Sequence, residues 1–275
     1  MTMNVLDAYL ERVYALVEEM RERAALVRVY QAPGIPGTGD LPGASDALAR
    51  LTEGLPIRVG PGASPGLILR SDTFLELGSP EAGSCSLLLA TDTTRLVHDG
   101  RVTLVGPEVG ESAGGSLPFG QVLMLRGAGL GEKDLDELQR LLVVAGQIEG
   151  YMVRSAPGNV WSRVSQEAAA KGFSFATLGR ALRALVMSGS PAVEAVEVLF
   201  VTSGKADLVP LEAAAQQVRK IAREGTRERW KVKGYDIDCA NDCSACGDKP
   251  VCDDIRSVLK ERQHIDESPG GTHAT

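Results

Sequence analysis

The sequence predicts a mixed α/β domain of the α+β class, and its order of segments is the main reason. The main body starts with short strand-like segments separated by turn residues, and continues with helices and one further apolar strand. Hydrophobic residues make up 44% of the 275 residues, which is enough for a packed core. Because aromatic residues make up only 4%, we expect that core to consist mainly of Leu, Val and Ala.

Residues 1–31 are predicted to contain an amphipathic helix. Apolar residues recur with the 3.6-residue period of a helix from Val5 to Met20, and charged residues occupy the opposite face. The apolar stripe must pack against the body of the chain or against a partner, and we expect packing within the chain. Residues 32–65 follow as a Gly/Pro-rich connection with at most one short helix, around Ala44–Leu51.

Residues 66–230 form the predicted main domain. Strands are expected in the segments LILRSDTFLELG, SCSLLLATD, RVTLVG and QVLMLRG, with a turn at His98-Asp99-Gly100. Helices are expected over residues 132–149, 162–171, 176–187 and 211–223, and an apolar strand over 193–202. Gly172 is the expected stop of the second helix, and Cys85 is expected to be a small buried residue.

Charge and hydropathy exclude several classes of protein. Lys and Arg total 29 while Asp and Glu total 36, so the net charge is −7, and we expect no binding to nucleic acid or to an anionic membrane. No apolar run is long enough to span a bilayer, and the N-terminus lacks the features of a signal or transit peptide. We therefore expect a cytoplasmic protein. No residue pattern favours hydrolytic or hydride-transfer chemistry.

Four cysteines in residues 231–263 carry the clearest chemical signal. Cys239, Cys243, Cys246 and Cys252 are separated by three, two and five residues, and the residues between them are mostly turn formers. Four thiols in one short loop make a soft-ligand cage for an iron–sulfur cluster or Zn²⁺. Structural zinc sites usually consist of two ligand pairs with a longer spacer, so this compact set favours [4Fe–4S]. The tail, residues 264–275, is expected to be disordered.

A second candidate site lies between Arg154 and Lys171. This window holds Arg154, Trp161, Arg163 and Lys171, which place cations beside an indole ring. Guanidinium groups next to an aromatic plane could hold the phosphates and adenine of an acidic ligand such as coenzyme A. The alternative is a helix that buries Trp161 and Phe173 and leaves its cations solvated.

Several motifs in residues 66–230 are collinear with those of a known family. Asp72–Gly78, Asp99–Glu108, Leu117–Gly120 and Asn159–Phe173 match an aspartate-led strand, a hairpin, a turn and a helix start, in that order. On these motifs the chain resembles the middle domain of the CO-methylating acetyl-CoA synthase. That protein is the β subunit of the carbon monoxide dehydrogenase/acetyl-CoA synthase complex.

The resemblance implies a middle-domain-like fold and a contact between coenzyme A and the element that contains Trp161 and Arg163. It also implies a protein partner of the carbon monoxide dehydrogenase or acyl-CoA enzyme type. The synthase carries a nickel-containing A-cluster after this domain. Here the cysteine cluster starts in the corresponding place at Cys239, but its spacing differs and no Cys-Gly-Cys follows. We therefore expect that this chain alone does not assemble a complete A-cluster.

These observations lead to three hypotheses. The first is a cluster-binding subunit or accessory protein in anaerobic one-carbon or acyl-CoA metabolism, in which four thiolates leave no iron open and the cluster transfers electrons or staples the fold. The second is an acyltransferase in which the cysteines bind nickel or a mixed cluster and an acyl-CoA thioester is made or broken. The third is a zinc-stapled interaction scaffold.

Overall fold

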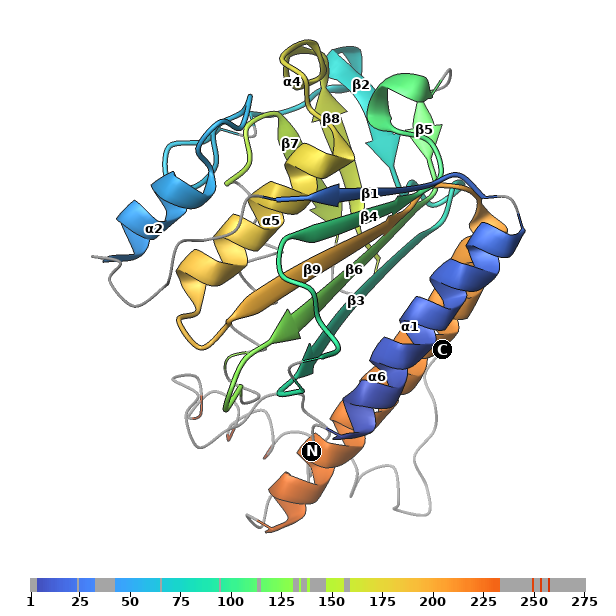
Figure 1. The fold of residues 1–275 in the computed structure, drawn as a ribbon, viewed down its shortest axis with the longest axis vertical. Coiled ribbons are helices and arrows are strands. Elements are labelled where there is room, and N and C mark those ends of the chain that lie inside the picture. Colours follow the sequence, from blue (N-terminus) through green and yellow to red (C-terminus); the bar gives the residue numbers. More distant parts are fainter. Residues whose placement is uncertain are drawn as a thin grey trace. The chain divides into compact units, whose positions relative to one another are not determined.

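The fold is described from a computed structural model of the chain. It describes residues 4–23, 25–32, 43–64, 66–93, 95–112, 115–130, 134, 138, 147–155, 159–232, 249, 253 and 257. The chain divides into two compact units, residues 2–216 and residues 217–275, the second joined by Met1, and each is described by itself. The elements (Figure 1) are α1 (Asn4–Glu22), β1 (Val27–Gln31), α2 (Gly43–Leu51), η2 (Arg70–Asp72), β2 (Thr73–Leu77), β3 (Ser84–Thr91), β4 (Arg101–Val105), η3 (Val109–Glu111), β5 (Ser116–Leu117), β6 (Phe119–Arg126), β7 (Tyr151–Ser155), β8 (Trp161–Ser165), α4 (Gln166–Ala170), α5 (Phe175–Gly189), β9 (Ala195–Val201) and α6 (Lys205–Val232).

Two mixed sheets organise the first unit. The larger has the strand order β1-β4-β9-β6-β3, in which β4 and β9 are parallel and β9 and β6 are antiparallel. The smaller has the order β5-β2-β8-β7, in which β2 and β7 both pair antiparallel with β8. Helices and mixed sheets of this kind confirm the predicted mixed α/β class.

The larger sheet is covered by helices on both faces. Helix α5 packs on β9 and β4, and α1 packs across the other face against β3 (Figure 1). All seven residues of β9 are buried, which is the burial expected for a central strand covered on both sides. The side chains of β9 alternate accordingly. Phe200 packs on Phe175 of α5, with ring centroids 5.2 Å apart, whereas Glu197 and Leu199 face α1.

The amphipathic stripe of α1 is buried within the chain, as expected. Its buried residues are Leu10, Val13, Leu16, Val17 and Met20. At the start of the helix, the Asp7 carboxylate accepts hydrogen bonds from the hydroxyls of Thr91 and Thr93, at 2.6 and 2.9 Å. Helix α1 is therefore fixed to the sheet by apolar contacts along its length and by polar contacts at specific points.

The inner face of the smaller sheet shares its core with α5. Leu75, Leu77 and Val164 belong to the same buried cluster as Leu178 and Leu182 of the helix. The ring of Tyr151 stacks with that of Phe173 at 5.9 Å between centroids. Helix α5 is buried along most of its circumference, because it lies among apolar groups on several sides.

One predicted helix is wrong in its first half. We expected a helix over residues 162–171, but residues 161–165 form strand β8 and only Gln166–Ala170 are helical, in α4. Ser162 and Val164 are buried while their neighbours are not, which is the two-residue period of a strand, and pairing with β2 and β7 stabilises it. The motif that resembles a helix start is therefore a strand. Gly172 does end α4, with a φ of +94°.

The boundaries predicted for the other elements differ less from those in the structure. Helix α5 and strand β9 lie where expected, and α6 begins six residues before the predicted Leu211. Strands β1 and β7 were not predicted at all. Most of the expected helix over residues 132–149 lies outside the described residues. Cys85 is buried, as predicted, at 1% exposure.

Candidate functional site

Arg154 and Trp161 are in contact on adjacent strands. Their strands, β7 and β8, are paired, and the guanidinium carbon of Arg154 lies 4.1 Å from the centroid of the indole ring. Arg154 is exposed and Trp161 is half-buried. A cation at this distance over an indole face makes a cation–π contact worth about 0.5–1 kcal/mol at an exposed site. The indole Nε1 is buried, and it has no acceptor among the residues that the structure describes.

Arg163 lies on the same outer face of the smaller sheet, but its guanidinium group is already paired with a carboxylate. Its Nε and Nη2 atoms lie 2.8 and 2.7 Å from Oε1 of Glu76, its cross-strand neighbour on β2. Its Nη1 donates to the carbonyl of Ile68 at 3.3 Å. Cross-strand pairs of opposite charge stabilise a sheet, so Arg163 has a structural explanation. A phosphate would have to compete with Glu76 for it.

Lys171 does not join this group. It follows α4, beyond the end of β8 opposite to Trp161, and its ammonium nitrogen lies 2.7 Å from Glu149 and 2.8 Å from Glu167. The hydrogen bond from Lys171 lowers the pKa of Glu149, and the bond to Glu149 raises the pKa of Lys171. Of the four residues predicted from the sequence, the structure brings Arg154 and Trp161 together, places Arg163 beside them on β8, and separates Lys171.

Exposed apolar side chains border the arginines. Leu67 and Leu69 are 78% and 53% exposed, and Phe74 at the start of β2 is 42% exposed. The hydrogen bond from Arg163 to Ile68 places this segment next to the outer face of β8. The surface therefore combines a stacked cation, an indole ring and apolar groups, which suits a ligand with an aromatic base, phosphates and an aliphatic arm.

The other motifs found in the sequence have structural roles. Asp99 makes a two-point ion pair with buried Arg183 of α5, at 2.9 and 2.5 Å, and accepts from the Val196 amide at 3.1 Å. The Glu108 carboxylate caps η3 and also accepts from the Phe175 amide at the start of α5, at 2.7 Å. These carboxylates position α5 against the larger sheet. The sequence pattern alone did not show their partners.

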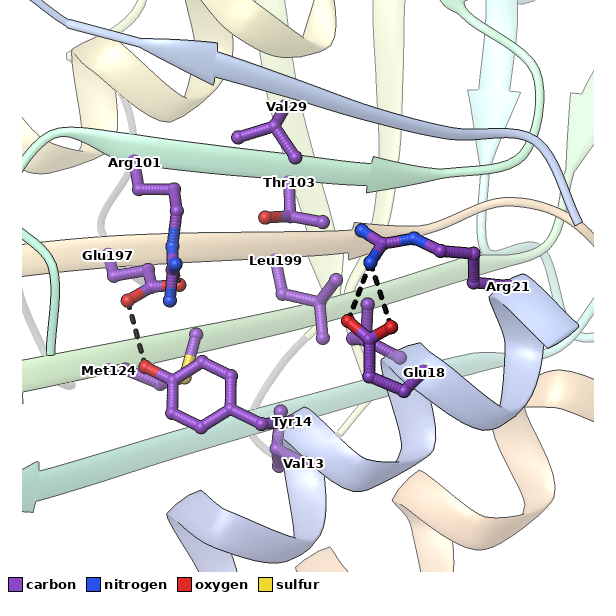
Figure 2. A pocket seen from close by; sticks show the side chains of 11 residues that line it. Val13, Tyr14, Glu18, Arg21, Val29, Arg101, Thr103, Met124, Glu197 and Leu199 are labelled. Atoms are coloured by element: carbon purple, nitrogen blue, oxygen red, sulfur yellow. Dashed lines mark hydrogen bonds and ion pairs between the residues drawn. The ribbon is translucent and has the colours of Figure 1, made fainter. Parts of the chain in front are cut away.

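A pocket that the sequence did not predict lies between α1 and the larger sheet (Figure 2). At its inner end, Glu197 of β9 is 1% exposed. Its carboxylate accepts from Arg101 Nε at 2.6 Å, from the Tyr14 hydroxyl at 2.8 Å and from the His98 amide at 2.9 Å. Both carboxylate oxygens of Glu197 therefore accept hydrogen bonds. The one signal in the sequence was a lone Glu in the apolar run AVEVLFV.

The groups around Glu197 shift one another's proton affinities. Burial, together with the charge and hydrogen bond of Glu197, raises the pKa of Tyr14 well above its ordinary value. Burial lowers the pKa of Arg101, but the hydrogen bond and charge of Glu197 outweigh that effect, so its pKa is raised. The Tyr14 hydroxyl also lies within hydrogen-bond distance of the Leu96 carbonyl, so its single proton is shared between two acceptors, and Arg101 lies 5.4 Å from the Tyr14 ring centroid. Tyr14 therefore stays protonated at neutral pH, and Arg101 stays charged beside it.

The four predicted metal ligands, Cys239, Cys243, Cys246 and Cys252, lie outside the described residues. Within the described part of the chain, no three His, Cys, Asp or Glu side chains gather as a metal site. Lys249, Asp253 and Ser257 are helical, and the Lys249 ammonium lies 2.6 Å from Asp253. Among the described residues, no helix is both long and apolar enough to cross a bilayer.

Comparison with known proteins gives a consistent match. A family described as "CO dehydrogenase/acetyl-CoA synthase complex beta subunit" matches residues 55–206. The chain is 29% identical over 201 residues to the acetyl-CoA decarbonylase/synthase complex subunit beta of Methanothermobacter thermautotrophicus, covering 70% of this chain and 41% of that protein. Subunit beta 1 of Methanosarcina acetivorans is 27% identical over 194 residues, covering 70% and 40%. The chain thus spans about two fifths of the length of these relatives.

Proposed function

Because the chain belongs to the CO dehydrogenase/acetyl-CoA synthase complex beta subunit family, we propose that it is an iron–sulfur accessory subunit of anaerobic one-carbon or acyl-CoA metabolism. In this proposal the family domain binds a protein partner and an acyl-CoA, and the C-terminal segment carries a [4Fe–4S] cluster. The observation that carries it is the set of four closely spaced cysteines that follows the family domain. The partner is a subunit of the kind with which the relatives, named as parts of a complex, assemble.

The donor set fits an iron–sulfur cluster. Cys239, Cys243, Cys246 and Cys252 supply four thiolates, which are the ligands of a [4Fe–4S] cluster. When bound, such a cluster supplies one-electron redox chemistry or a rigid crosslink. Because all four irons then have a cysteine ligand, substrate binding at an open iron is not part of the proposal. The role of these residues is to hold the cluster and to set its charge and its access to solvent.

Metal analysis of anaerobically purified protein tests this proposal. We expect a brown protein with broad absorbance at about 400 nm and about four irons per chain. Cys243→Ser should lose the iron, whereas the matched control Cys85→Ala should keep it, because Cys85 is buried in β3. One zinc per chain and no colour would favour the scaffold hypothesis, and stoichiometric nickel would favour the acyltransferase hypothesis. Either result would refute the iron–sulfur assignment.

The stacked pair of Arg154 and Trp161 supports coenzyme A as the ligand of the family domain. Its indole ring can stack on adenine and its guanidinium can pair with a phosphate, while Leu67, Leu69 and Phe74 offer apolar surface to the aliphatic arm. Arg163 is held by Glu76, and Lys171 lies elsewhere, so Arg154 is the principal cation in this proposal.

Tryptophan fluorescence tests coenzyme A binding directly. The chain has two tryptophans, so a Trp230→Phe background leaves Trp161 as the reporter. We expect coenzyme A to quench its emission with a Kd of about 0.1–1 mM. Arg154→Gln should weaken binding about tenfold, while Arg180→Gln, a cation that donates to the Glu53 carbonyl elsewhere, should not. Unchanged emission at millimolar coenzyme A would leave Trp161 with a structural role only.

A further inference from the structure

We propose that the pocket between α1 and the larger sheet binds a short-chain monocarboxylate. The pocket encloses about 110 Å³ and is lined by residues of α1, β1, β4, β6 and β9 (Figure 2). Helix α1 and strand β1 precede residues 55–206, the region that matches the family, whereas β4, β6 and β9 lie within it. The pocket therefore depends on a segment outside the matched region. This inference is independent of the function proposed above.

Two guanidinium groups supply the positive charge. Figure 2 shows Arg101 on β4 and Arg21 on α1 on either side of the space above Leu199. Arg101 uses its Nε for Glu197, at 2.6 Å. Arg21 uses one terminal nitrogen, Nη1, for both oxygens of Glu18, at 2.7 and 2.8 Å. A guanidinium carries five N–H donors, so each arginine keeps donors beyond those given to its carboxylate.

Thr103 supplies a hydroxyl between the two arginines. It is 7% exposed, lines the pocket, and points its hydroxyl toward the side of Arg101 in Figure 2. Among the described residues, the Thr103 hydroxyl has no hydrogen-bond partner, and it is not one of the fully buried polar atoms. The hydroxyl is therefore free to donate to an acceptor bound in the pocket. A carboxylate oxygen is a suitable acceptor.

The charge balance of the pocket disfavours more than one negative charge on the ligand. Its charged groups are Arg21 and Arg101 with Glu18 and Glu197, so they sum to zero. Glu197 is fully paired, with Arg101, Tyr14 and the His98 amide. Glu18 and Arg21 are half-exposed, and such surface pairs are weak, so Arg21 can turn toward a ligand at little cost. A dianion would meet two carboxylates without enough positive charge.

The apolar walls favour an alkyl tail on that anion. Val13, Val17, Val29, Met124 and Leu199 line the remaining surface. Val29 is 54% exposed, whereas the other four are 0–8% exposed. A short aliphatic chain bound here would cover the exposed part of Val29 and contact the other four side chains, and an inorganic anion does neither. These features together specify a carboxylate with a few carbon atoms.

Calorimetric titration with butyrate tests the proposal on the full chain. We expect a Kd of about 1–10 mM for butyrate, and binding at least about tenfold weaker for neutral butyramide and for inorganic phosphate. Thr103→Val and Arg21→Gln should each weaken butyrate binding about fivefold or more, with unchanged circular dichroism. Arg28→Gln is the matched control, because Arg28 points to the other face of β1 and pairs with Glu111, and should bind as the parent does. Absence of butyrate binding at about 50 mM, equal binding of phosphate, or undiminished binding by both variants would overturn the proposal.

Discussion

The Tyr14 hydroxyl of α1 donates a hydrogen bond to the buried Glu197 carboxylate of β9 at 2.8 Å, and this bond joins the N-terminal helix to the centre of the family domain. The two residues are 183 positions apart in the sequence. Glu197 also takes hydrogen bonds from Arg101 and the His98 amide, so Tyr14 completes the pairing of a charge that has almost no access to water. Helix α1 and the larger sheet belong to the same compact unit.

Tyr14→Phe should lower the free energy of unfolding by about 2 kcal/mol, the range for a hydrogen bond to a charged group. The phenyl ring keeps the apolar packing, so the loss comes from the hydroxyl alone. Urea denaturation followed by circular dichroism measures it. Arg12→Gln on the same helix removes only an exposed ion pair with Glu19 and should cost less than about 1 kcal/mol. Equal effects of the two changes would contradict this account of Tyr14.

Stability should fall at high pH because folded tyrosines resist ionisation. Burial raises the pKa of Tyr151 from 10.0 to about 12, and the pKa of Tyr14 is raised as well. A raised pKa favours the protonated form in the folded state, so the stabilisation is complete below about pH 10 and is lost between about pH 10 and 12. For Tyr151 the total is on the order of 3 kcal/mol.

Unfolding measurements across pH 8–12 on the parent and Tyr151→Phe test this prediction, and the variant should lose less stability over about pH 10–12. Tyr30→Phe is a useful comparison, because burial and Glu108 raise the pKa of Tyr30 but that residue is only partly buried. If the parent and Tyr151→Phe have parallel profiles, Tyr151 ionises as freely in the folded chain as in the unfolded one.

Asp99→Asn should destabilise the domain by about 3 kcal/mol. Arg183 is buried at 3% exposure, and Asp99 is its two-point partner, so removing the negative charge leaves a buried cation without compensation. Thermal unfolding at neutral pH measures the change. Glu194→Gln removes the partner of Arg126 in a more exposed pair, at 3.5 Å, and should change stability by less than about 1 kcal/mol. A small effect of Asp99→Asn would show that the Val196 amide, and not Arg183, is the important partner of Asp99.

Gly78→Ala should be much more harmful than Gly54→Ala. Both glycines have positive φ, +68° and +72°, so each substitution carries the same backbone strain, about 1 kcal/mol. A Cβ on Gly78 would lie 2.5 Å from the Val160 carbonyl oxygen and 2.6 Å from the Ser84 Cβ, whereas none lies within 4 Å at Gly54. The difference between the two variants in chemical denaturation isolates the steric contact. Equal losses would mean that backbone strain alone explains Gly78.

Local sequence patterns were sufficient to predict a helix or strand where one hydrophobic period dominates the segment. The stripe from Val5 to Met20 predicted α1, and the apolar run that contains Glu197 predicted β9, because burial of one face or of both faces leaves a clear spacing. The segment from Trp161 to Lys171 was misjudged in its first half. Its polar and apolar residues suit a short helix as well as a strand, and pairing with β2 and β7 decides between them.

The sequence by itself determined the mixed α/β class, the family and the presence of four closely spaced thiols, because these depend on composition, spacing and residue order. Only the tertiary structure decided which partner each charged side chain has. Arg163 is bound to Glu76, Lys171 to Glu149, and Arg183 to Asp99, while Arg154 lies over Trp161. The strength of an ion pair depends on the distance between its charged atoms. Strand register and helix packing set these distances, because they bring segments together that are far apart in the sequence.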